Sequence, residues 1–225
     1  ATLSCFWRML PGVRMTDPGC GLKLVRRSTF ATLKIPADAR GFSFGAEAFV
    51  RLARTGAKLV TNYELAMWLG KLGVTALDPM NTGGTTDQGE FTVTLTQALH
   101  SSVEVDANGV FHCLGLPNGI VVTPKDKHEP TIYHMGDTDI FSDMALIDEL
   151  YAPTVALVPV GDRFTMGPRA AALSVKRYLR NVTTAIPCHY ATFGMLLPDA
   201  KGFEAEMVGA KAKVLVPEKG KPVSL

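Results

Sequence analysis

The chain has 225 residues, of which 47% are hydrophobic and 20% charged, a composition typical of a globular protein with one large domain or two small ones. Its 23 basic and 21 acidic residues leave a net charge of +2, which is too small to favour nucleic acid or an anionic membrane surface as a partner. No apolar run approaches the roughly 18–20 residues that cross a bilayer, so we expect no membrane-spanning segment.

The four cysteines, Cys5, Cys20, Cys113 and Cys188, form no C-x-x-C pair and no regular framework. In a chain of this length such a pattern is typical of reduced thiols. We therefore expect a cytoplasmic protein without structural disulfides.

The first part of the chain is rich in glycine and proline. Residues 12–21 predict loops, Gly21–Arg26 predicts a short strand, and Phe44–Thr55 predicts an amphipathic helix that ends at Gly56. No long linker follows this part, so we expect it to pack on the rest of the chain as one body.

The second part is more regular. Asn62 is a candidate cap for a helix over Tyr63–Leu72, and Phe91–Thr96 alternates between apolar and polar residues as a half-buried strand does. The Asn108-Gly109 pair predicts a tight hairpin between Val103–Asp106 and Val110–Leu114.

Strands and helices then alternate. The predicted strands are Ile120–Thr123, Thr131–His134, Val155–Val160, Val182–Pro187 and Val214–Val216, and the predicted helices are Ile140–Tyr151 and Pro168–Leu179. Many strands followed by a βαβα tail indicate a mixed α/β sandwich.

All five histidines lie between His100 and His189, and three metal-capable side chains each follow a strand-like run. These are His100, Asp137 and His189. Imidazoles and a carboxylate brought to one edge of a sheet are suitable ligands for a transition metal. Each one alone is a common surface or turn residue, but the three together predict a metal site.

Several stretches resemble the metal-dependent hydrolase branch of the metallo-β-lactamase superfamily, in its order and spacing, over about residues 58–216. They are Thr61–Ala66, Met80–Thr85, Ala98–Ser102, Ile132–Met144, Pro159–Pro168 and Pro187–Phe193. The resemblance implies an αββα sandwich in which His100, Asp137 and His189 bind metal and Asp137 is catalytic. It also implies a small-molecule substrate with an ester, lactone, amide or phosphodiester bond.

The same family supplies further ligands from an H-x-H-x-D-H motif before an early helix. The corresponding residues here, Arg40–Gly45, contain no metal ligand. We therefore expect an incomplete sandwich with half of the site missing, and one divalent metal, zinc by preference, rather than two. A fold that is catalytically inactive, or that only binds a partner, is the alternative.

The front has a resemblance of its own. Thr16–Arg27 and Gly41–Ala57 are similar to part of an inverting glycosyltransferase of the dolichyl-phosphate mannose synthase type, although residues 1–57 contain no D-x-D motif. We therefore predict a chimera with an atypical segment at 1–57 and a hydrolase domain at 58–225. A glycosyltransferase fragment is a further alternative function, and a homo-oligomer is compatible with the sequence.

The remaining candidates have weaker support. His134 is interpreted as a residue that either supports a metal ligand or packs in its strand, Cys188 as a packing residue, and His112 and His128 as surface residues. Arg163 either binds an anionic substrate or pairs with Asp162, and the sequence does not separate these two interpretations.

Overall fold

The computed structural model describes residues 58–71, 73–105, 108–192 and 194–218, together with the backbone of three strands near the start of the chain. These are β1 (Ser4–Trp7), β2 (Val13–Asp17) and β3 (Lys23–Arg26), which pair antiparallel. Strand β3 confirms the predicted strand, whereas β2 corrects the prediction of loops over residues 12–21. The predicted helix at 44–55 lies outside the described residues.

A seven-stranded mixed sheet forms the centre of the described fold, in the order β14-β13-β12-β11-β10-β7-β6. Its strands are β6 (Thr85–Asp87), β7 (Phe91–Gln97), β10 (Asn118–Pro124), β11 (Ile132–His134), β12 (Val155–Pro159), β13 (Thr184–Cys188) and β14 (Lys213–Val214). Strands β11 to β14 are parallel, and β10 is antiparallel to both β11 and β7. Strand β7 therefore ends at the same edge as β11, β12 and β13.

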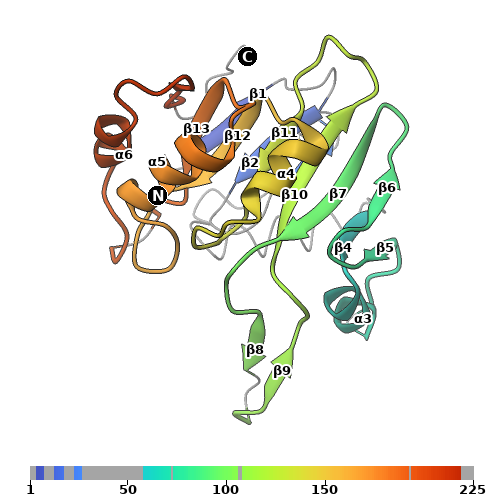
Figure 1. The fold of residues 1–225 in the computed structure, drawn as a ribbon. Helices are drawn as coiled ribbons and strands as arrows, with labels where there is room; N and C mark the ends of the chain where they lie inside the picture. Colours follow the sequence, from blue (N-terminus) through green and yellow to red (C-terminus); the bar gives the residue numbers. More distant parts are fainter. Residues whose placement is uncertain are drawn as a thin grey trace.

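Helices α4 (Met144–Tyr151), α5 (Pro168–Leu173) and α6 (Lys201–Glu206) cover one face of this sheet (Figure 1). Pro168 begins α5 as predicted, and the helix continues as the π-turn η1 (Ser174–Tyr178). Alternate strand residues divide between two cores: Tyr133 and Val158 pack with the helices, and Ile132 and Leu157 belong to the other face. The prediction of an α/β fold is confirmed.

Strand β7 corrects one prediction. Its alternating pattern indicates a half-buried strand, yet Val93, Thr94, Leu95 and Thr96 are all buried. The strand lies between β6 and β10, and the hydroxyls of Thr85 and Thr94 are 2.8 Å apart, so a threonine satisfies its polar group inside the fold.

Beside β6 lies a small unit of β4 (Leu59–Asn62), α3 (Tyr63–Lys71) and β5 (Leu77–Met80), in which β4 and β5 are parallel. Asn62 caps α3 as predicted, because its Oδ1 accepts a hydrogen bond of 2.8 Å from the Leu65 amide.

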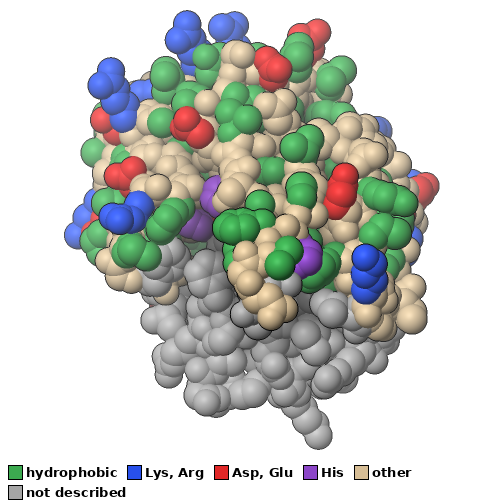
Figure 2. Space-filling model, turned by 90° about the horizontal axis from the view of Figure 1, so that it is seen from below, with side chains coloured by type: hydrophobic (Ala, Val, Ile, Leu, Met, Phe, Trp, Pro, Cys, Tyr) green, Lys and Arg blue, Asp and Glu red, His purple; other side chains and the backbone are tan. Residues whose placement is uncertain are grey.

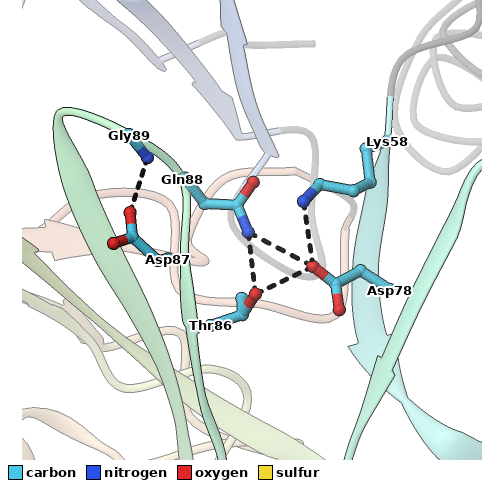
Figure 3. A network of polar contacts seen from close by, with 6 residues as sticks. All are labelled: Lys58, Asp78, Thr86, Asp87, Gln88 and Gly89. Atoms are coloured by element: carbon cyan, nitrogen blue, oxygen red, sulfur yellow. Dashed lines mark hydrogen bonds and ion pairs between the residues drawn. The ribbon is translucent and has the colours of Figure 1, made fainter.

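A polar network joins this unit to β6 (Figure 3). The Asp78 carboxylate accepts hydrogen bonds from Thr86 and Gln88 and lies 3.1 Å from the Lys58 ammonium. Burial acts to raise the pKa of Asp78, but the hydrogen bonds from Thr86, Lys58 and Gln88 outweigh it, so the pKa lies below its ordinary value. The carboxylate is therefore held in its charged form.

Between β7 and β10 the chain forms the predicted hairpin, β8 (Val103–Val105) and β9 (Phe111–Cys113), which projects from the sheet (Figure 1). Its connection is longer than the two-residue turn expected from Asn108-Gly109, since Val105 pairs with Phe111. No helix in the described part of the chain is long and apolar enough to cross a membrane.

Candidate metal centre

Asp137 and His189 lie at the same edge of the sheet and at equivalent positions in the strand register. His134 of β11 pairs with Leu157 of β12, and Leu157 pairs with Ile186 of β13. Asp137 and His189 each lie three residues beyond this row, at the carboxyl ends of parallel strands. Their positions in the sequence therefore bring them together at one edge.

The two side chains meet there. Nε2 of His189 lies 3.6 Å from Oδ2 of Asp137, and both side chains are largely buried, with exposed fractions of 5% and 13%. This separation is too long for a direct hydrogen bond. It is close to the roughly 3.4 Å between two ligand atoms of one tetrahedral zinc ion, given bonds of about 2.1 Å. The pair therefore has the spacing of two ligands to one ion.

Strand β12 lies between β11 and β13, and Gly161 follows its end. A side chain at Gly161 would overlap the carbonyl oxygen of His189 and would lie 3.2 Å from its Nδ1. Gly161 thus leaves the space that His189 occupies. Sequence reasoning missed this residue, although a glycine directly after an all-apolar strand was a usable signal.

The loops at this edge contain most of the unusual backbone in the described residues. Asp162, Arg163, His189 and Ala191 have positive φ, from 51° to 61°, without being glycine. Each such residue costs of order 1–3 kcal/mol, and such residues gather at functional sites. The two loops bond to each other through the Leu197 amide and the Gly161 carbonyl, at 3.0 Å. The strain is thus concentrated where Asp137 and His189 meet.

His100 follows β7, and its neighbour Leu99 is tied to the loop that carries Asp137. The Leu99 amide donates to the Thr138 hydroxyl at 2.9 Å, and the Asp139 amide donates to the Leu99 carbonyl at 3.2 Å. The His100 side chain itself is exposed, and its Nδ1 lies 2.9 Å from the Ser101 carbonyl oxygen. Since a carbonyl only accepts, Nδ1 carries the proton, and Nε2 of the neutral ring keeps the lone pair that a metal requires.

The three predicted ligands are therefore not in equivalent positions. Asp137 and His189 are in contact, whereas His100 reaches the same edge with its ring turned to Ser101. Within the described ranges, no group of three or more His, Cys, Asp or Glu side chains is arranged to hold a metal ion. Nδ1 of the buried His189 also lacks a hydrogen-bond partner among these residues. The donor set fits a metal between Oδ2 of Asp137 and Nε2 of His189, because a carboxylate oxygen and an imidazole nitrogen at this separation are suitable ligands for one ion.

Neighbouring candidates take structural roles. The Gly136 amide donates to Nδ1 of buried His134, so in the neutral ring the proton is on Nε2, which then offers no lone pair to a metal. Cys188 is buried in the core of the second sheet face, and His128 is exposed, as predicted.

Tyr190 follows His189 directly. Its pKa is raised by partial burial first and then by the charges of Cys188 and Glu204, which keeps this phenol neutral beside His189.

Comparison with known proteins shows the family to which the chain belongs. The family described as "Beta-lactamase superfamily domain" matches residues 37–190, and the chain belongs to this superfamily. Within it, the chain is 55% identical over 171 residues to a UPF0173 metal-dependent hydrolase of Methylobacterium nodulans, covering 76% of this chain and 71% of the relative. A UPF0173 metal-dependent hydrolase of Rhizobium meliloti is 51% identical over 171 residues, covering 76% and 72%. The chain is a member of the UPF0173 metal-dependent hydrolase family.

Solved structures show the same fold. Igni18, a metallo hydrolase from the archaeon Ignicoccus hospitalis, superposes with a TM-score of 0.68 at 25% identity, covering 98% of this chain and 96% of that one. An isothiocyanate hydrolase from Delia radicum gut bacteria superposes with a TM-score of 0.55 at 21% identity, covering 73% and 66%. The predicted superfamily is confirmed, whereas the glycosyltransferase resemblance and the division at 57/58 stay predictions.

Proposed function

We propose that this chain is a metal-dependent hydrolase in which Asp137 and His189 bind one divalent metal, with His100 as the third ligand. The observation that carries the proposal is the 3.6 Å approach of two largely buried side chains, Asp137 and His189, at the carboxyl edge of the sheet. Membership of a family of metal-dependent hydrolases supports it. Imidazole and carboxylate ligands make zinc the preferred metal.

Each ligand has a separate task in this proposal. His189, fixed by its left-handed backbone and by Gly161, binds through Nε2. Asp137 binds through Oδ2, and its carboxylate accepts a hydrogen bond from the attacking water. When bound, a divalent metal supplies hydroxide near neutral pH and stabilises negative charge on oxygen. The substrate class is an ester, lactone, amide or phosphodiester of a small molecule.

His100 is the proposed third ligand because its segment is hydrogen-bonded to the loop of Asp137 and Nε2 of its neutral ring carries a lone pair. Three protein ligands with an open fourth position are the usual set for a catalytic zinc. The H-x-H-x-D-H motif is absent from residues 40–45, so we propose one metal rather than two.

The test is metal content per chain in protein purified without chelator or added metal. We expect about one zinc, manganese or iron per chain in the wild type, which is the content of a three-ligand site, and almost none in His189→Ala. His128→Ala is the matched control, because His128 is exposed in the loop between β10 and β11. Hydrolysis of an ester, lactone, amide and phosphodiester panel should be lost with the metal and restored by adding it.

A second candidate function is a protein that keeps the fold but catalyses no reaction. One observation favours it: in the described residues, no group of three or more metal-capable side chains is arranged to hold a metal ion. Well-folded wild-type protein that carries no metal and takes up none would exclude the hydrolase and leave this alternative. The glycosyltransferase alternative predicts that a nucleotide sugar raises the Tm, which the same protein preparation can test.

A further inference from the structure

The hairpin β8–β9 has one apolar face. Val103 pairs with Cys113 and Val105 pairs with Phe111, so these four side chains lie on the same face of the two-stranded ribbon. All four are exposed, and 74% of Phe111 is accessible to solvent. The residues between them, Glu104 and His112, point to the opposite face.

The opposite face is anchored to α3. The rings of His112 and Trp68 have their centroids 4.6 Å apart. The chain after β9 is held as well, because Nδ2 of Asn62 donates to the Leu116 carbonyl at 3.0 Å. The hairpin is thus fixed against α3 by its polar face, and its apolar face is turned away from that helix.

This orientation puts the apolar face on the side of the hairpin where the loops of the candidate metal centre lie (Figure 1). Strand β8 begins three residues after His100, at the edge where the loops of Asp137 and His189 lie. In Figure 1, α3 lies on one side of the hairpin, and the loops that follow β11, β12 and β13 lie on the other. Figure 2 looks onto this edge and shows histidine side chains set back in a hollow, with hydrophobic side chains beside them.

Other exposed apolar side chains gather at the same edge. More than half of the large hydrophobic side chains that are exposed in the described residues belong to its loops and hairpin, including Leu99, Val105, Phe111, Leu116, Phe164 and Met195. Where exposed apolar side chains of this kind adjoin one another, they mark a binding site rather than ordinary surface.

We propose that the apolar face of β8–β9 binds a hydrophobic group of the substrate, such as an alkyl or aryl chain next to the bond that is hydrolysed. The inference rests on the proposed function, since it places the reacting bond at Asp137 and His189. Phe111 and Val105 determine the preference for hydrophobic substrates, and the metal ligands do not.

The test compares octanoate with acetate, which are products of a long-chain and a short-chain ester. Binding is measured calorimetrically below the micelle concentration of octanoate, so it needs no turnover. Each buried methylene adds about fourfold in affinity, and we expect octanoate to bind at least tenfold more tightly than acetate. Phe111→Ser and Val105→Ser should each remove most of this difference and leave acetate binding unchanged.

Two controls separate this effect from a general loss of apolar surface. Glu104→Gln changes the other face of the same hairpin, and Leu150→Ser changes an equally exposed side chain, 71% accessible, at the end of α4 near the opposite edge of the sheet. Both variants should bind octanoate as the wild type does.

The outcomes distinguish this inference from the proposed function. Equal binding of octanoate and acetate, or an equal loss in the Leu150→Ser control, would overturn the inference even if the protein binds metal and hydrolyses esters. Sedimentation gives a third outcome. If Phe111→Ser converts a dimer into a monomer without changing the affinity for octanoate, the apolar face binds a second copy of the chain and the inference is overturned. Octanoate selectivity in a protein that takes up no metal would support the surface and overturn the hydrolase.

Discussion

Replacing Gly161 by alanine tests the geometry of the candidate metal centre with a single methyl group. An ideal Cβ at this position would overlap the His189 carbonyl oxygen and lie 3.2 Å from Nδ1. Gly161 has no positive φ, so alanine adds no backbone strain of its own. The whole effect is steric, and the methyl must displace the backbone of the residue that we propose as a metal ligand.

Overpacking of this kind costs about 1–3 kcal/mol. In a chain of this length, each kcal/mol lowers the Tm by about 2–4 °C. We therefore expect Gly161→Ala to melt several degrees below the wild type and also to lose metal affinity, because His189 is moved relative to Asp137. Gly194→Ala is the matched control, since it lies in the loop that follows His189 and its Cβ would meet nothing within 4 Å.

The assay combines thermal unfolding with a competition titration of zinc against a chromophoric chelator. The specific result is a loss of affinity in Gly161→Ala that remains when its metal-free form is shown to be folded at the assay temperature. If Gly161→Ala has the same Tm and the same metal affinity as the wild type, Gly161 does not lie as close to His189 as the structure places it. If it melts lower with unchanged affinity, His189 is not a ligand.

Three stability predictions concern the parts that support the site. Asn62→Ala should cost about 1–2 kcal/mol in urea unfolding, since it removes the cap of α3, and Asn62→Asp should cost less because it keeps the capping oxygen. The pKa of the Asp78 carboxyl group lies below its ordinary value of 3.8. The charged carboxylate therefore stabilises the fold fully at pH values above 3.8, and this stabilisation is lost as the pH falls through the lowered pKa. Asp78→Asn should make the free energy of unfolding depend less on pH in this acid range. Buried Asp148 accepts hydrogen bonds from the backbone and side chain of Asn181, so Asp148→Ala should cost about 1–3 kcal/mol in urea unfolding, because hydrogen bonds to a charged group are lost.

The order of elements from α3 to β14 was largely predictable, because apolar periodicity and local caps determine them. Strand β5 was not, since Asp78-Pro79 is unfavourable in a strand and its pairing with β4 depends on contacts distant in sequence. Helix α6 was missed because it is short, contains Gly202 and has no side-chain cap. The burial of Thr94 was not predicted because the sequence does not show whether a threonine in a strand faces water or another hydroxyl.

The candidate site also depends on contacts that the sequence pattern does not predict. The sequence places Asp137 and His189 after β11 and β13, but these strands are separated by β12, and two strand spacings amount to about 9.6 Å. Side chains at the strand ends would not meet if β12 continued between them with a side chain of ordinary size. The contact of 3.6 Å arises where Gly161 leaves room and His189 takes a left-handed backbone.

Neither of these two features appears in the spacing of the predicted ligands. A strand-end pattern therefore predicts which residues reach the edge, whereas the residue on the intervening strand decides whether they can share one ion. In this chain that residue is Gly161, which has no metal-binding group of its own. A search for ligands alone would pass over it, and a substitution there would separate the ligands without changing any of them.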